Sequence, residues 1–219
     1  MKRIAAALLA LTLAAPAASA QLPLDPSVAV TFNNNTSRRT GATGFGGEGG
    51  GYFGSFNIDF PTETRTFENY LLWCIDAYRG VQVPGTTTYQ FFTVQSFVQS
   101  GYGAPIWPSG EYDVTAGDMG NVTSLVNTLS TDWSSLSAGQ RNDYQGSIWQ
   151  SFRGQSTYPN SATAIIAGDP YFETSGWYVL YNGTNQTFLV QVAEPGTIAL
   201  LLLGLSGMAF MAFRRRSVQ

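Results

Sequence analysis

Cys74 is the one cysteine in this chain, and no histidine accompanies it. A thiol becomes a strong nucleophile when it loses its proton, so Cys74 is the first side chain whose chemistry needs an explanation. The absence of histidine excludes Ser-His-Asp and Cys-His catalytic arrangements and every zinc site that uses histidine. A single cysteine also excludes an internal disulfide and a metal site built from several thiolates. Any reaction at Cys74 must therefore use neighbours other than histidine or a second cysteine.

Carboxylates are the other groups that could carry chemistry. Four oxygen-bearing residues gather in one short stretch: Glu111, Asp113, Asp118 and Asn121. Their spacing is not that of a Ca²⁺-binding EF-hand loop, so we interpret them as a solvated turn and a helix cap. Asp59 and Asp76 near strand ends form an alternative, a glycosidase acid and base, although the sequence does not set their separation. We expect no metal, no cofactor and no enzymatic activity.

The elements that must position Cys74 are mostly strands. Cys74 lies in an apolar run within the predicted strand segment 66–77. Glycines dominate residues 34–51, which we expect to form a flexible surface loop. Alternating or aromatic-rich segments predict the other strands, at residues 28–33, 52–60, 87–99, 176–181 and 186–192, with a short edge strand at 111–114.

Two helices interrupt the strands. Apolar residues recur at helical spacing over 121–130, and a second helix is expected over 138–152, behind a capping box of Ser137 and Gln140. On the second helix Gln145 precedes two apolar residues by three and four positions, so its carboxamide faces the same core. The order of strands, two inserted helices and strands predicts an α+β domain that is mostly antiparallel β-sheet.

Three segments together resemble the thioester domains of bacterial surface adhesins. They are LWCID at 72–76, LSAGQ leading into YQGSIW at 136–149, and VQV at 190–192. The resemblance implies that the Cys74 thiol condenses with the Gln191 carboxamide and releases ammonia, which leaves an internal thioester. It also implies that Gln145 is the helical partner, able to hydrogen-bond the carbonyl.

In the family that these segments resemble, a nucleophile on a partner attacks the thioester carbonyl and becomes covalently attached. The resemblance therefore implies an adhesion module whose ligand is a polysaccharide or a protein nucleophile on a surface or in a matrix. The helical motif departs from that family at Tyr144 and Ser147, which replace Thr and Ala. The alternative is a structural or carbohydrate-binding component of an exopolysaccharide or biofilm matrix, in which Cys74 is an inert buried side chain.

Export signals are predicted at both ends of the chain. A basic start, an apolar stretch and the Ala18-Ser19-Ala20 site predict a signal peptide over residues 1–20. Residues 21–193 then form one extracytoplasmic, β-rich domain. Residues 21–194 hold six arginines, fourteen carboxylates and no lysine, a net charge near −8. Because no basic patch exists, nucleic acid is not an expected partner.

The C-terminal end of the chain has the features of a membrane-spanning sorting signal. The uncharged run 197–213 has the length of a transmembrane helix, and Arg214, Arg215 and Arg216 mark its cytoplasmic end. Glu194 and Pro195 ahead of this run make residues 194–219 resemble the PEP-CTERM sorting signal of Gram-negative bacteria, with Ala193 in place of the first proline. The resemblance implies cleavage by an exosortase-type membrane peptidase. It implies an inner-membrane intermediate and then a place at the cell surface, outer membrane or extracellular matrix, whereas the alternative is an ordinary tail anchor.

Overall fold

The computed structural model describes residues 27–33, 38–44, 47–59, 64–77, 79–101, 103–105, 111–153 and 166–192. All of them belong to one unit that spans residues 23–192. The predicted signal peptide and the predicted sorting signal, with its transmembrane run 197–213, lie outside the described residues. Among the residues that are described, no helix is long and apolar enough to cross a membrane.

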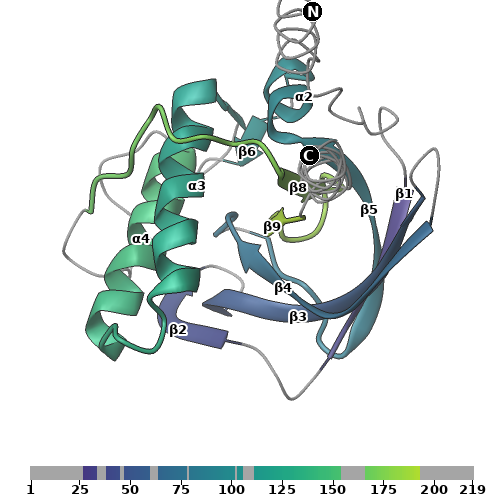
Figure 1. Cartoon of the computed structure of the whole chain (residues 1–219), viewed down its shortest axis with the longest axis horizontal. Coiled ribbons are helices and arrows are strands. Elements are labelled where there is room, and N and C mark those ends of the chain that lie inside the picture. Colours follow the sequence, from purple (N-terminus) through teal and green to yellow (C-terminus); the bar gives the residue numbers. More distant parts are fainter. Residues whose placement is uncertain are drawn as a thin grey trace, which may run out of the picture. The chain divides into compact units, whose positions relative to one another are not determined.

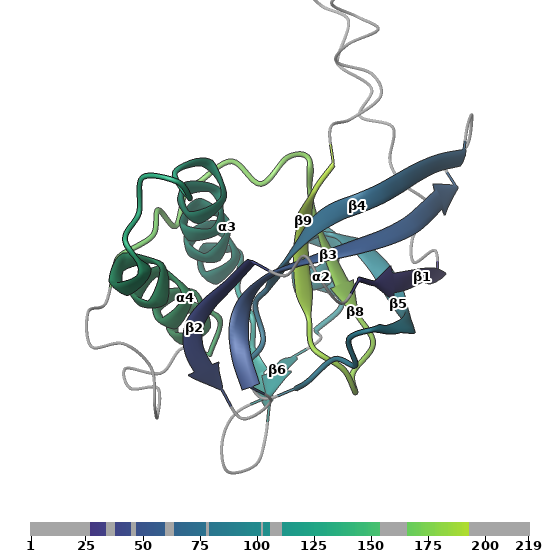
Figure 2. The same ribbon diagram turned by 90° about the horizontal axis from the view of Figure 1, so that it is seen from below.

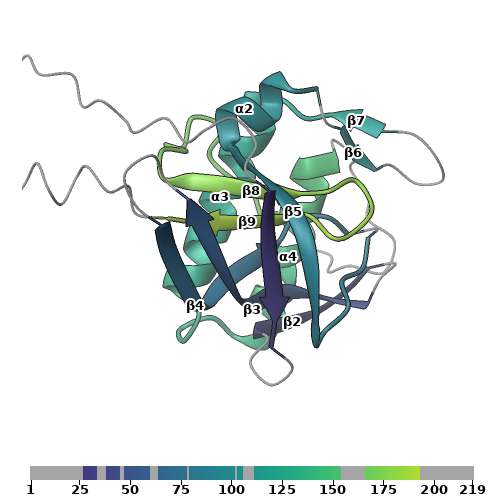
Figure 3. The same ribbon diagram turned by 90° about the vertical axis from the view of Figure 1, so that its right-hand side faces the viewer.

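Within the described part of the chain, six antiparallel strands close into a barrel. In order around the barrel they are β1 (Ser27–Phe32), β5 (Gly85–Thr93), β8 (Trp177–Tyr181), β9 (Phe188–Gln191), β4 (Thr64–Cys74) and β3 (Gly47–Asp59). The ring closes because β1 pairs with β5 on one side and with β3 on the other. Figure 3 shows β1 between these two strands. A further strand, β2 (Arg38–Gly44), pairs with β3 outside the ring.

Alternation along the strands fills the barrel with apolar side chains. In β1 every second residue is buried, and these residues are Val28, Val30 and Phe32. Successive side chains of a strand point to opposite faces, so this pattern directs one whole face of β1 inward. Four rings meet there, mostly edge to face: Phe32, Tyr52, Tyr89 and Phe188. Such aromatic pairs add to the stability gained from burying their area.

Helices α3 (Ala116–Thr131) and α4 (Ala138–Arg153) lie side by side next to the barrel (Figure 1). Figure 2 shows β2 beside α4 in a second view, and the two elements are in contact. Thr115 and Asp118 form a reciprocal capping box at the start of α3. Ser137 and Gln140 exchange the two hydrogen bonds of the capping box that the sequence predicts for the second helix.

The mostly β architecture with few helices matches the predicted fold class, but some predicted boundaries are wrong. The predicted strand 87–99 ends at Thr93, because the Thr93 hydroxyl accepts a hydrogen bond from the Ser96 amide at 3.0 Å and starts the short helix α2 (Val94–Gln99). The first predicted long helix begins at Ala116 rather than at residue 121. The short hairpin of β6 (Gly103–Pro105) and β7 (Glu111–Asp113) includes the predicted edge strand.

The largest correction concerns residues 34–51. The sequence predicts a flexible surface loop there, whereas the structure has β2 and the first part of β3. Glycine has no side chain to pack in a strand, so a glycine run usually weakens a strand prediction. Here β3 forms through the glycines, and the absence of side chains lets helix α4 approach its backbone closely at Gly49.

Candidate functional site

Cys74 is the last residue of β4, and its side chain is fully buried. The strand lies between β3 and β9, and Cys74 pairs with Phe188 of β9. Just beyond the strand, the amide of Ile75 donates to the carbonyl of Thr187 at 3.0 Å. The thiol itself donates to the carbonyl of Asp76 at 3.3 Å. The end of β4 is therefore fixed to the stretch of chain that leads into β9.

The carboxamide of Gln186 lies directly against the thiol. Its Nε2 is 2.5 Å from Cys74 Sγ and 3.2 Å from the carbonyl oxygen of Asp76. The first distance is below the range of about 2.7–3.2 Å for N–H···O hydrogen bonds, although sulfur is a larger atom than oxygen. Gln186 is 6% exposed, and its own amide donates to the carbonyl of Gly80 at 3.1 Å. Backbone and side chain together hold this carboxamide in contact with the sulfur.

Gln145 reaches the same cysteine from α4. Its Nε2 donates to the backbone carbonyl of Cys74 at 3.0 Å, across 71 residues of sequence. The side chain is fully buried, and its Oε1 has no hydrogen-bond partner among the described residues. Gln145 thus joins the helical layer to the end of β4, and one carboxamide oxygen remains available beside the cysteine.

The structure does not bring Gln191 to Cys74, and strand geometry gives the reason. Phe188 is the residue opposite Cys74, and side chains two residues apart share a face while those three apart do not. Gln186 therefore falls on the face of Cys74, and Gln191 falls on the other. Gln191 is exposed and borders a separate cavity of about 240 Å³. Gln186, rather than Gln191, is the glutamine of this part of the chain whose carboxamide contacts Cys74.

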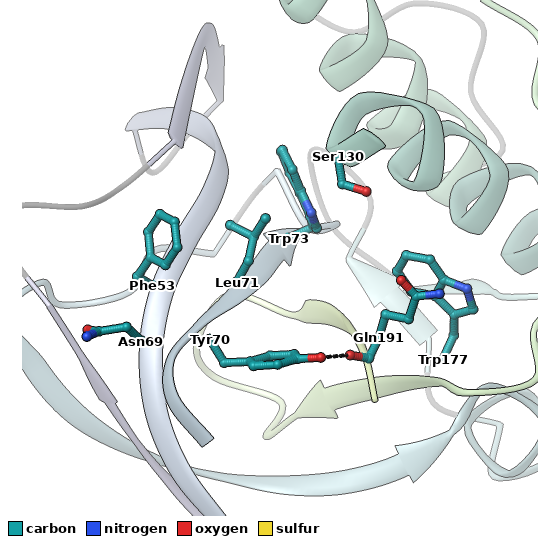
Figure 4. A pocket seen from close by; sticks show the side chains of 8 residues that line it. All are labelled: Phe53, Asn69, Tyr70, Leu71, Trp73, Ser130, Trp177 and Gln191. Carbon is teal, nitrogen blue, oxygen red and sulfur yellow. Dashed lines mark hydrogen bonds between the residues drawn. The ribbon is translucent and has the colours of Figure 1, made fainter. Parts of the chain in front are cut away.

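Figure 4 shows the surroundings of Gln191. Its neighbours around that cavity include Tyr70, Trp73 and Trp177. The hydroxyl of Tyr70 donates to the backbone carbonyl of Gln191 at 2.5 Å. Because Trp177 pairs with Gln191 across the sheet and Trp73 pairs with Leu189, these side chains share the face that points away from Cys74. No cysteine is among the residues that line this cavity.

The glycines at the start of β3 make room for the site. A Cβ on Gly49 would lie 2.2 Å from the ring of Trp149 and 2.9 Å from Gln145 Cγ. Gly50 has φ of 136°, a conformation that side chains disfavour, and its backbone hydrogen-bonds the Cys74 sulfur. The glycine-rich sequence therefore lets α4 approach the strand closely. A glycine run flanked by alternating residues was the signal that could have revealed this approach.

A buried carboxylate braces the turn that follows Cys74. Asp76 is 2% exposed and accepts hydrogen bonds from the hydroxyl of Thr187 and from the backbone amide of Arg79, both at 3.3 Å. The Arg79 guanidinium lies 3.5 Å from the same carboxylate and over the ring of Tyr181. These contacts tie the residues after Cys74 to the residue after Gln186. The contacts of Asp76 therefore help to fix Cys74 and Gln186 relative to each other.

Burial raises the pKa of the Cys74 thiol to about 12. Removal from water is the main cause, because the thiolate is the charged form. A side-chain hydrogen bond from Trp149 opposes this shift, and the nearby Asp76 carboxylate adds to it. Burial also raises the pKa of Tyr89, whose hydroxyl interacts electrostatically with Cys74. The thiol is therefore protonated at neutral pH, unlike the exposed, acidic cysteines of redox enzymes.

The raised pKa predicts how a free Cys74 thiol affects stability. Gln186→Leu removes the carboxamide that contacts the thiol, and the pKa of the thiol should stay above the unfolded value of 9.0. The folded state then holds the proton more tightly, so the stabilisation is present below about pH 9 and is lost as the pH rises toward 12. Urea unfolding of Gln186→Leu between pH 8 and 10.5 should show this decline.

The matched control removes the thiol and keeps every other titrating group. Gln186→Leu with Cys74→Ala retains Asp76 and Tyr89, so it reports their share of the pH dependence. The free energy of unfolding should fall more steeply with pH in the variant that keeps the thiol. Parallel curves for the two variants would mean that Cys74 does not carry a raised pKa.

Residues 191–216 match the family model described as the PEP-CTERM protein-sorting motif. The match confirms the sorting signal that the C-terminal sequence predicts. It indicates an exported protein that is held in the membrane before processing by an exosortase, which is a membrane peptidase. No curated protein and no solved structure is similar enough to this chain to count as a match. The motif begins at Gln191, the last residue of β9.

Proposed function

We propose that this exported, exosortase-sorted chain is an adhesion module that attaches to its partner through a thioester between Cys74 and Gln186. One observation carries the proposal, the 2.5 Å approach of Gln186 Nε2 to Cys74 Sγ inside a buried site. That nitrogen is bonded to the side-chain carbonyl carbon that the sulfur would attack, so the contact holds the two reacting groups next to each other, as an intramolecular reaction requires. Cys74 and Gln186 are 112 residues apart in sequence, so their contact depends on the fold.

Formation of the bond balances without another reactant. The Cys74 sulfur adds to the Gln186 side-chain carbonyl carbon, and the carbon–nitrogen bond of the carboxamide breaks. The thiol proton passes to the departing nitrogen, which leaves as ammonia. A buried thiol with a high pKa is a weak nucleophile. The Gln186 nitrogen that contacts the sulfur becomes basic once the sulfur has added to the carbonyl carbon, so it can then take the proton and leave.

The surroundings suit a bond that must survive in water. Cys74 and Ile75 are fully buried, Trp149 is 1% exposed, and Gln186 is 6% exposed. Hydrolysis needs water at the carbonyl carbon, and this burial limits it. The composition of the chain also suits a thioester, which amines can attack. Lys2 is its one lysine and lies in the predicted signal peptide, so the rest of the chain offers no lysine amine for self-attachment.

The intact mass of the purified full chain tests the proposal. Loss of ammonia should lower the mass by about 17 Da relative to the sequence, after correction for any leader that has been removed. Cys74→Ala and Gln186→Ala should each have the full mass of their own sequence. Gln191→Ala, the matched control on the other face of β9, should keep the deficit.

A wild-type chain at full mass, whose cysteine alkylates stoichiometrically on unfolding, would contradict the thioester. The inert-cysteine alternative, a structural or carbohydrate-binding matrix component, would then stand. A deficit lost in Gln191→Ala and kept in Gln186→Ala would instead restore the pairing that the sequence analysis predicted.

A further inference from the structure

Gln186 lies very close in sequence to the C-terminal sorting motif. Strand β9 starts two residues after it, and the motif begins at Gln191, where the strand ends. We propose that tension between a covalently attached partner and the C-terminal segment passes through residues 186–192 alone and leaves the rest of the domain outside the force path. This inference rests on the proposed function, because the partner must be attached at Gln186.

The chemistry places the tether on the glutamine. When a partner amine attacks the thioester, its nitrogen bonds to the side-chain carbon of Gln186 and the carbon–sulfur bond breaks. The sulfur leaves with the proton that the amine gives up, and Cys74 becomes a thiol again. The partner is then held by an amide on Gln186, while Cys74 is linked to nothing but its own backbone.

The segment between the two attachment points has little slack. Residues of a strand already rise about 3.3 Å each, close to the maximum of about 3.6 Å per residue for a chain. Strand β9 lies between β8 and β4, and Phe188, Leu189 and Val190 are fully buried. At its end the Val192 amide donates to the Gly176 carbonyl at 2.8 Å. Pulling at Gln186 and beyond Val192 therefore stretches an extended strand that its neighbours hold in place.

Pulling from the two ends of the domain is a different geometry. Force then passes through the whole chain, and unfolding releases length. An intact Cys74–Gln186 bond would keep the chain between these two residues, 112 positions apart, from extending, which is about 400 Å at roughly 3.6 Å per residue. The length released on pulling from both ends thus reports whether the thioester is present. It does not depend on which residues carry the force from a partner attached at Gln186.

Single-molecule force spectroscopy on the full chain tests separately whether the thioester is present and whether force passes through residues 186–192 alone. With one handle at each end, wild type should release about 400 Å less than Cys74→Ala, and an equal release would contradict the proposed thioester. With an amine-bearing handle captured at Gln186 and the second handle at the C-terminus, no domain-unfolding step should appear. A full unfolding step in this second geometry would overturn the force path while the thioester stood.

A thiol handle tests the path without any thioester. In a Cys74→Ala background, Thr184→Cys carries the handle at an exposed position two residues before Gln186. Pulling there against the C-terminus should again give no unfolding step. Thr88→Cys on β5, also exposed, is the matched control and should release the chain between β5 and β9. A similar release from both sites would overturn the inference.

Discussion

Gly49→Ala is expected to destabilise the domain by about 3 kcal/mol or more, a large effect for one methyl group. The added Cβ would lie 2.2 Å and 2.4 Å from two ring atoms of Trp149. The indole is 1% exposed, so it cannot swing out into solvent without disturbing the side chains that cover it. The displaced helix would also draw Gln145 away from the Cys74 carbonyl, so the mass deficit should shrink together with stability. Urea unfolding and intact mass measure the two effects.

A smaller side chain at position 149 tests whether the loss in Gly49→Ala comes from the clash with Trp149 or from any side chain being unfavourable at this position of β3. The atoms that meet the new methyl belong to the six-membered ring of Trp149, so Trp149→Phe should recover part of the stability lost in Gly49→Ala. Gly139→Ala at the start of α4, where the nearest atom to a new Cβ is 4.0 Å away, is the control and should stabilise slightly. Additive losses in the double variant would argue against a Gly49–Trp149 contact.

Gln145→Glu should cost about 3–5 kcal/mol at neutral pH. The amide nitrogen that donates to the Cys74 carbonyl at 3.0 Å becomes a carboxylate oxygen, so two acceptors face each other in a fully buried place. Burial disfavours the charged form, which raises the folded pKa of the new carboxyl. The loss should therefore be smaller at pH 4 and grow as the pH rises. Urea unfolding at a series of pH values measures it.

Gln145→Met is the control of similar size. It removes the hydrogen bond and leaves the Cys74 carbonyl without its donor, which should cost about 1–3 kcal/mol with little dependence on pH between 4 and 8. Equal losses in the Glu and Met variants, or a Glu variant that is insensitive to pH, would mean that residue 145 does not face the Cys74 carbonyl in a dry site.

Most strands and both long helices follow from local pattern, because burial on one face imposes a period of two or of 3.6 residues. The Ser137–Gln140 capping box also follows, since both of its hydrogen bonds are local. The loop predicted at 34–51 failed for the opposite reason. Gly49 in this stretch is explained by Trp149 and Gln145, which lie about a hundred residues later in the chain.

The sequence alone determined two things: that the chain is exported and carries a sorting motif, and that it has one cysteine whose chemistry needs an explanation. Each is a matter of hydrophobicity, charge or counting within a short window. The choice between Gln186 and Gln191 needed the tertiary structure. Both glutamines belong to one predicted strand, and only its register against β4, with Phe188 opposite Cys74, decides which carboxamide meets the sulfur. A register between strands that are far apart in sequence is set by packing of the whole barrel.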